Sequence, residues 1–112
     1  ATKTWLWCLA ELGMQKPLDI AEIHQRIHSL NNWTLEPNND GIQKDWEFES
    51  FKRAVEFFVR VSELAEALDH HPEVLSTYNK MRIRLTTHDA SGLTHRDFEL
   101  AARIDALYRI EF

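Results

Sequence analysis

The sequence has little cysteine, glycine or proline, and it has no long apolar run. Its 112 residues include one Cys, three Gly and three Pro. A lone cysteine, Cys8, excludes an internal disulfide and gives no sign of an oxidising compartment. So few Gly and Pro exclude a collagen-like or low-complexity chain. The longest apolar stretch, residues 5–10, is far shorter than the roughly 20 residues of a membrane-spanning helix.

Positive charge is also scarce. Thirteen Lys and Arg against 18 Asp and Glu give a formal net charge of −5, and no basic run occurs. Contacts to phosphates depend on clustered Lys and Arg, so we expect no direct nucleic-acid partner. We expect no membrane association either, and we place the protein in the cytoplasm, with the nucleus or an organelle as open alternatives.

What is present is enough apolar sequence for one folded domain. Apolar residues make up 44% of a chain whose length is that of a single domain. Residues 1–16 follow no periodic pattern, and we interpret them as an N-terminal extension. Residues 17–112 are the predicted domain.

Three segments have apolar residues at helical intervals, and each begins with a capping residue. The N-cap candidates are Asp19, Ser50 and Thr94, and the helices are expected to run to about residues 30, 69 and 108. Glu22 and Asp97 stand three positions after the first and third cap, which is capping-box spacing. The pattern predicts three helices with defined starts.

Four shorter segments are predicted strands. Residues 33–35 and 42–49 are separated by a Pro- and Asn-rich turn, and residues 74–78 and 81–86 by the tight connection 79–80. In the second strand Ile42, Lys44, Trp46 and Phe48 share the face predicted to be buried. The order αββαββα, with two antiparallel hairpins, predicts a two-layer α+β domain: a four-stranded antiparallel sheet with three helices on one face.

The middle helix carries more apolar surface than one core requires. Its apolar residues between 51 and 68 cover an arc of roughly 220°, whereas facing one core takes about 100°. One explanation is burial deep in its own domain. We favour the other, in which the extra face packs against a second subunit.

Six histidines are present, and three of them stand at the ends of predicted elements. His70 and His71 end the long helix, and His88 follows the last strand. Loops held by a rigid frame often carry functional groups, and histidine titrates near neutral pH, so this trio could donate and accept protons. The others, His24, His28 and His95, are interpreted as surface residues.

Each of these residues also has a simpler interpretation. His70-His71-Pro72 could close a helix, whose dipole favours imidazoles at its C-terminus. His88 could bond a turn, and Asp97 could be a cap only. Zn²⁺ needs three or four ligands, and two adjacent histidines rarely both reach one ion, so no metal is predicted; a metal-dependent hydrolase is the corresponding rival function.

The spacing of the motif resembles a known signature. Glu66, three residues, His70-His71-Pro72, five residues, Tyr78, nine residues, His88, eight residues and Asp97 are similar to the signature of pterin-4a-carbinolamine dehydratases. Residues 45–54 and 85–97 also resemble that family, and the match extends over about 18–107. His95 departs from the acidic residue that the family carries there.

The resemblance implies a fold, an activity and partners. The fold is αββαββα, and no metal or organic cofactor is used. The reaction converts 4a-hydroxytetrahydropterin to quinonoid dihydropterin and water, in recycling the tetrahydrobiopterin of an aromatic amino acid hydroxylase; another pterin pathway is the open alternative. Family members form homodimers or homotetramers, the latter through the helix at 51–68. The alternative function is a dimerisation or coactivator module acting through that helix.

The resemblance also implies residue roles. His70 and His88 would share the acid and base roles, and His71 would orient the pterin. Glu66 and Asp69 would fix a histidine tautomer or simply solvate a helix end, and Asp97 would bond a pocket histidine or Arg96, which is compatible with its capping role. Tyr78 would bind substrate or only pack, and Pro72 would shape the backbone. The implied binding residues are Glu66, Asp69, Pro72, Tyr78, Thr87, Arg96 and Asp97.

Overall fold

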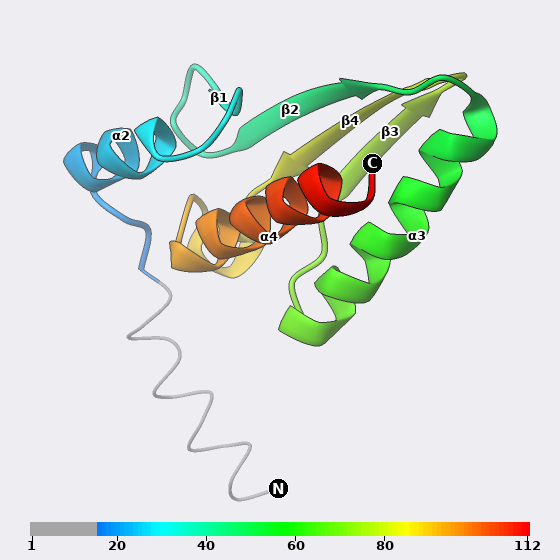
Figure 1. The fold of residues 1–112 in the computed structure, drawn as a ribbon. Helices are drawn as coiled ribbons and strands as arrows, with labels where there is room; N and C mark the ends of the chain where they lie inside the picture. Colours follow the sequence, from blue (N-terminus) through cyan, green and yellow to red (C-terminus); the bar gives the residue numbers. More distant parts are fainter. Residues whose placement is uncertain (1–15) are drawn as a thin grey trace, which may run out of the picture.

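The computed structural model describes residues 16–112, so Cys8 and all but the last residue of the expected extension lie outside it. The expected α+β order is confirmed (Figure 1). The elements are α2 (Ile20–His28), β1 (Thr34–Leu35), β2 (Ile42–Glu47), α3 (Phe51–Leu68), β3 (Glu73–Thr77), β4 (Lys80–Leu85), a 3₁₀ turn η1 (His88–Ala90) and α4 (His95–Glu111).

The helices begin where the capping residues predict. The Asp19 side chain accepts from the Glu22 N–H, and the Ser50 hydroxyl accepts from the Arg53 N–H. Thr94 and Asp97 form the expected capping box of α4. These contacts satisfy N–H groups that the first turn of a helix leaves without partners.

The sheet has four antiparallel strands in the order β1-β2-β4-β3. Thr77 pairs with Lys80, so Tyr78 and Asn79 form the β3–β4 turn, and both strands begin one residue earlier than expected. The cause is the backbone of Tyr78, whose φ of 53° ends the strand. β2 also ends early, at Glu47, because the backbone of Phe48 bonds to Asn79 in that turn instead of continuing the ladder.

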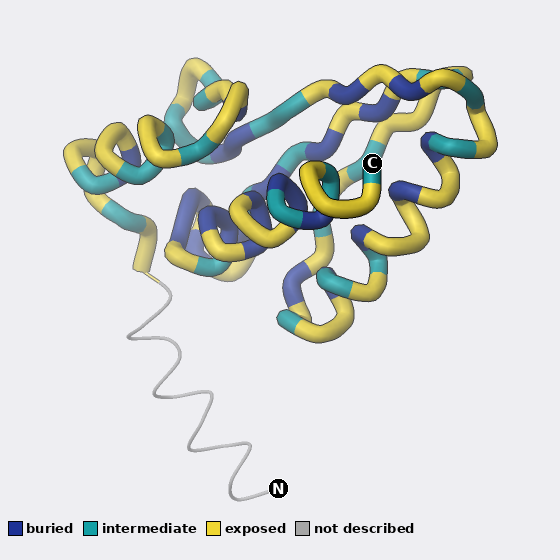
Figure 2. Tube along the Cα trace, viewed as in Figure 1, coloured by how far each residue is buried: buried dark blue, intermediate teal, exposed yellow. Residues whose placement is uncertain are grey.

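The core lies between one face of the sheet and the helices. In Figure 1, α3 and α4 lie together beneath the sheet, while α2 lies near the β1 end. The long strands contribute alternate residues to this core, and α3 contributes a stripe of Ala54, Phe57, Val61 and Ala65. Figure 2 shows the same alternation as dark segments along the strands and on the inner side of α3.

The rest of the apolar surface of α3 is not covered within the chain. Phe51, Val55, Phe58 and Val59 are each 38–53% exposed. The interpretation that α3 is buried deep in its own domain is therefore wrong. Its outer face is an exposed apolar stripe at helical spacing, which we call the outer stripe of α3.

None of the helices between residues 16 and 112 has the length and apolarity needed to cross a membrane.

Candidate functional site

His70 is held at the point where α3 turns into β3. Asp69 caps the helix with a φ of 50°, a conformation that Asp tolerates better than most residues. The backbone N–H of His70 then bonds the Ala65 carbonyl at 3.0 Å. This cap turns the chain inward and leaves the His70 side chain buried. The predicted role of the His-His-Pro segment in closing the helix is thus compatible with a functional role.

The buried ring of His70 meets a buried carboxylate. His70 Nε2 lies 2.6 Å from Asp97 Oδ1, in the first turn of α4. Asp97 is fully buried. A carboxylate is tolerated in a protein interior when hydrogen bonds replace its lost water. A contact across 27 residues thus joins the end of α3 to the start of α4.

The second oxygen of Asp97 joins a third segment to this pair. Asp97 Oδ2 accepts from the Thr87 hydroxyl at 2.7 Å and from the Thr94 N–H at 3.0 Å. The two threonine hydroxyls lie 2.9 Å apart. Thr87 follows β4, so the ends of α3 and β4 and the start of α4 meet at one carboxylate. We call His70, Thr87, Thr94 and Asp97 the Asp97 network.

His88 is the next residue after Thr87. It begins η1 and is exposed. The ring of His70 is therefore connected to His88, the second predicted acid or base, through Asp97 and Thr87. The connection consists of two hydrogen bonds and the peptide bond between Thr87 and His88. Thr87 itself is almost fully buried, so its side chain faces the network and not the surrounding water.

His71, the next residue after His70, contacts a different carboxylate. It is exposed, and its Nε2 lies 3.2 Å from Glu66 Oε2 on the last turn of α3. A hollow of about 360 Å³ brings these two together with Pro72 and with Phe58 of the outer stripe. Three of the predicted site residues therefore line one hollow beside the exposed face of α3.

The remaining predicted residues are placed differently. Asp69 is the exposed cap of α3, and Arg96 lies half-buried in the first turn of α4, its N–H bonded to Thr94 Oγ1. Tyr78 is 70% exposed at the β3–β4 turn, so the expectation that it might pack in a strand is wrong. At about 3.3 Å per residue, β3 separates Tyr78 from Pro72 by roughly 20 Å.

Three carboxylates are candidates for the partner that fixes the ring of His70. Glu66 and Asp69 are close to it in sequence, and Asp97 is expected to bond a pocket histidine or Arg96. The structure gives that contact to Asp97, while Glu66 contacts His71. Thr94 was predicted only as a cap. Its capping box with Asp97 is the signal that could have brought it into the site.

A second buried polar cluster joins β2 to α4 and is not predicted from the sequence. Asp105 of α4 accepts from Trp33 Nε1 at 3.0 Å and from Lys44 Nζ at 2.9 Å. The signal was available, because Lys44 stands on the strand face predicted to be buried. A buried lysine needs an acidic partner. This cluster ties β2 to α4 and contains no predicted site residue.

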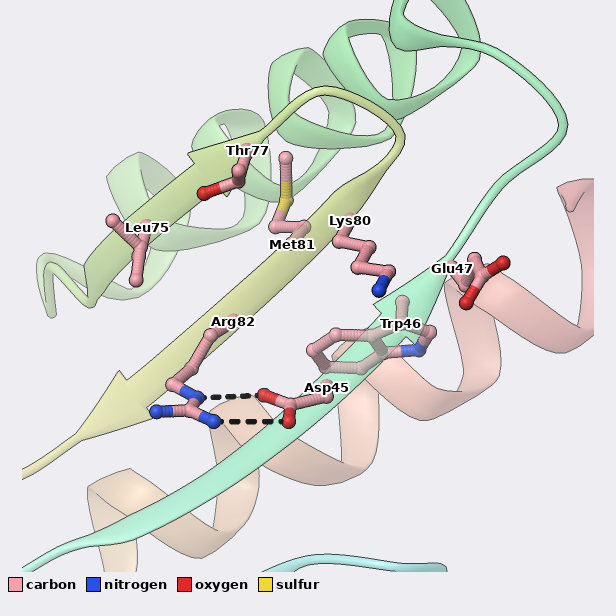
Figure 3. A pocket seen from close by; sticks show the side chains of 8 residues that line it. All are labelled: Asp45, Trp46, Glu47, Leu75, Thr77, Lys80, Met81 and Arg82. Atoms are coloured by element: carbon pink, nitrogen blue, oxygen red, sulfur yellow. Dashed lines mark hydrogen bonds and ion pairs between the residues drawn. The ribbon is translucent and has the colours of Figure 1, made fainter.

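The face of the sheet that the helices leave uncovered also contains a hollow. Figure 3 shows Asp45 and Glu47 on one side of it, Lys80 and Arg82 across from them, and Leu75 beside them, around a volume of about 610 Å³. Hydrogen bonds from Arg82 lower the pKa of Asp45 and in turn raise the pKa of Arg82. None of the predicted histidines lines this hollow.

The donor groups of the described residues are not arranged as a metal site. Between residues 16 and 112, no three His, Cys, Asp or Glu side chains are grouped so that they could hold a metal ion. His70 and His71 have different carboxylate partners, Asp97 and Glu66.

Comparison with known proteins points to one family. A family model described as pterin 4 alpha carbinolamine dehydratase matches residues 16–107. A protein of Sinorhizobium medicae, provisionally named a pterin-4-alpha-carbinolamine dehydratase, is 43% identical over 79% of this chain and 84% of its own length. One from Chloroflexus aggregans with the same provisional name is 46% identical over 80% of this chain and 95% of its own.

Solved structures agree on the fold. A structure from Brucella melitensis, described as a transcriptional coactivator/pterin dehydratase, has a TM-score of 0.79 and 29% identity, over 82% of this chain and 98% of that one. A pterin dehydratase-like protein described as a RuBisCO assembly factor in the α-carboxysome has a TM-score of 0.60 and 23% identity, over 69% of this chain and 89% of that one. The latter likeness concerns the fold alone.

Proposed function

Because the chain belongs to the pterin 4 alpha carbinolamine dehydratase family, we propose that it dehydrates 4a-hydroxytetrahydropterin to quinonoid dihydropterin and water. Membership of this family supports pterin dehydratase activity, which is a hydro-lyase reaction. The proposal adds the histidine chemistry and the recycling of tetrahydrobiopterin. The observation that carries it is the buried contact of His70 with Asp97. The same carboxylate accepts from Thr87, the residue just before His88.

The reaction needs one acid and one base. The bond between C4a and the hydroxyl oxygen breaks, and that oxygen takes up a proton and leaves as water. A ring nitrogen then loses its proton, which leaves the neutral quinonoid product. Hydroxide is a poor leaving group, so a proton donor lowers the barrier, and a positioned acceptor completes the step. Two histidines of suitable orientation are sufficient.

The described residues divide these tasks. His70 is oriented by Asp97 and is one proton-transfer group, and His88 is the other. His71, with Glu66 beside it, binds and orients the pterin from the hollow that Pro72 also lines. Asp69, Tyr78 and Arg96 remain proposed binding residues.

The test is a coupled assay on purified protein. An aromatic amino acid hydroxylase supplies the carbinolamine, and its decay is followed with and without this chain, after subtraction of the uncatalysed rate. His70→Ala and His88→Ala should each slow turnover by about 10²- to 10⁴-fold. His24→Ala, which removes an exposed histidine of α2, should leave the rate unchanged.

His70→Gln separates catalysis from packing. Its amide can donate to Asp97 as Nε2 of His70 can, but it cannot exchange a proton near neutral pH. It should fold as the parent does and still lose turnover. Full activity in both His70→Ala and His88→Ala would refute the assignment of acid and base.

A second function is supported by the outer stripe of α3. Its four exposed apolar residues form the kind of surface that packs against another helix. We propose that it forms a homodimer or homotetramer, or docks a protein partner. A pull-down that survives His70→Ala but is lost when α3 is changed would separate partner binding from catalysis.

A further inference from the structure

The Asp97 network has a fixed direction of hydrogen bonding. The backbone N–H of Arg96 can only donate, and it donates to Thr94 Oγ1 at 3.3 Å. Asp97 Oδ2 accepts from the Thr87 hydroxyl at 2.7 Å. Because the single proton of Thr87 is used there, the contact between the two hydroxyls at 2.9 Å must be a donation from Thr94 to Thr87.

This direction determines what Asp97 offers to His70. Oδ2 already accepts from Thr87 and from the Thr94 N–H. Donors in a row polarise one another and stabilise the negative charge at the end of the chain. Oδ1 is then left as an acceptor for His70 Nε2 at 2.6 Å. An acceptor at that position requires the ring proton to be on Nε2.

The other ring nitrogen of His70, Nδ1, lies outside the Asp97 network. No hydrogen-bond partner of Nδ1 occurs among the described residues. Trp46 Nε1 is the one side-chain nitrogen or oxygen in residues 16–112 that is both fully buried and unpaired. Nδ1 is therefore not sealed inside the protein, although the ring as a whole is buried.

We propose that Thr87 is a positioning residue that holds Asp97 so that His70 keeps its proton on Nε2 and presents Nδ1 as the proton acceptor. The catalytic consequence rests on the proposed dehydratase function; the tautomer itself does not. The assignment makes His70 the base and leaves the acid role to His88. In this proposal Thr87 acts on Asp97 and does not contact the substrate directly, which agrees with the burial of Thr87.

The tautomer can be measured without any substrate. Two-bond ¹H–¹⁵N correlation spectra of ¹⁵N-labelled protein, recorded over a pH series, distinguish the two neutral forms of the ring. The parent should show His70 protonated on Nε2. Thr87→Val removes the hydroxyl at nearly constant shape and should introduce the Nδ1-protonated form. Thr87→Ser should restore the parent spectrum.

The neighbouring threonine is the matched control. The Thr86 hydroxyl bonds the Asp40 carbonyl and does not touch Asp97, so Thr86→Val should leave the His70 tautomer unchanged. A parent ring protonated on Nδ1 would overturn the proposal, even if Thr87→Val failed to fold. So would an unchanged tautomer in a folded Thr87→Val.

Turnover provides the second readout. Thr87→Val should lower kcat by roughly 10- to 100-fold, as loss of an orienting partner of a functional histidine commonly does, with a smaller change in KM and a shifted pH profile. Thr87→Ser should recover most of the rate. If the parent shows the expected tautomer but no dehydration, the proposed reaction fails and the positioning role of Thr87 stands.

Discussion

Tyr78 combines an unfavourable backbone with a side chain that the fold does not use. Its φ of 53° lies in the left-handed region, which costs a residue with a Cβ roughly 1–2 kcal/mol. Its ring is 70% exposed, so packing does not repay that cost. A residue that is both strained and exposed is a candidate for function, here in substrate or partner binding.

We predict that Tyr78→Gly raises the free energy of unfolding by up to about 1 kcal/mol, because glycine adopts positive φ without strain. Chemical denaturation followed by circular dichroism measures this change. If Tyr78 binds the pterin, KM should rise in the same variant while kcat changes little. Thr77→Gly, one residue earlier in β3, should instead destabilise the protein. A loss of stability in Tyr78→Gly would show that the turn is not strained.

At the level of elements, local chemistry predicted the frame well. Asp19, Ser50 and Thr94 start their helices as expected because a cap acts on N–H groups only two or three residues away. Strand ends were less predictable: the left-handed Tyr78 shifted β3 and β4 by one residue. Nothing in a tyrosine signals that conformation, since turns of this kind usually contain Gly, Asn or Asp.

Contacts between elements were harder to predict than the elements. The signature brought His70, His88 and Asp97 into one hypothesis, in which Asp97 was expected to bond a pocket histidine or Arg96. Spacing alone could not show that this partner is His70. That pair depends on how α4 packs against the end of α3. The contact of Lys44 with Asp105 has the same origin. In both cases a buried polar residue of one element was paired only by tertiary packing.

The outer stripe of α3 leads to a prediction about assembly. Val59, 50% exposed, lies within the stripe, and a charge there would oppose burial against a second subunit. Val59→Glu should therefore lower the molar mass measured by light scattering over a concentration series. Ile110→Glu changes an even more exposed apolar residue, at 77%, on α4 and should leave the mass unchanged. Equal effects of both variants, or none in Val59→Glu, would argue against assembly through α3.

On the scale of the whole chain, the start of the described segment supports the loop that carries His88. The Leu18 N–H bonds the Leu93 carbonyl at 2.8 Å. Pro17 packs so close to Gly92 that an added Cβ would lie 3.2 Å from its ring. The Gly92 carbonyl in turn accepts from the Thr87 N–H at 3.0 Å. Residues 17 and 18 thus reach the Asp97 network through one intervening loop.

This connection predicts where the functional domain begins. A chain that starts at Lys16 keeps both contacts and the whole segment that the family model matches, so its thermal midpoint and dehydration rate should equal those of the full chain. A chain that starts at Asp19 keeps the cap of α2 but loses Pro17 and Leu18. It should unfold at a lower temperature and turn over more slowly, because the loop between Thr87 and Leu93 loses its outer support. Equal loss in both truncated chains would instead place residues 1–15 within the functional unit, and no loss in either would show that the loop supports itself.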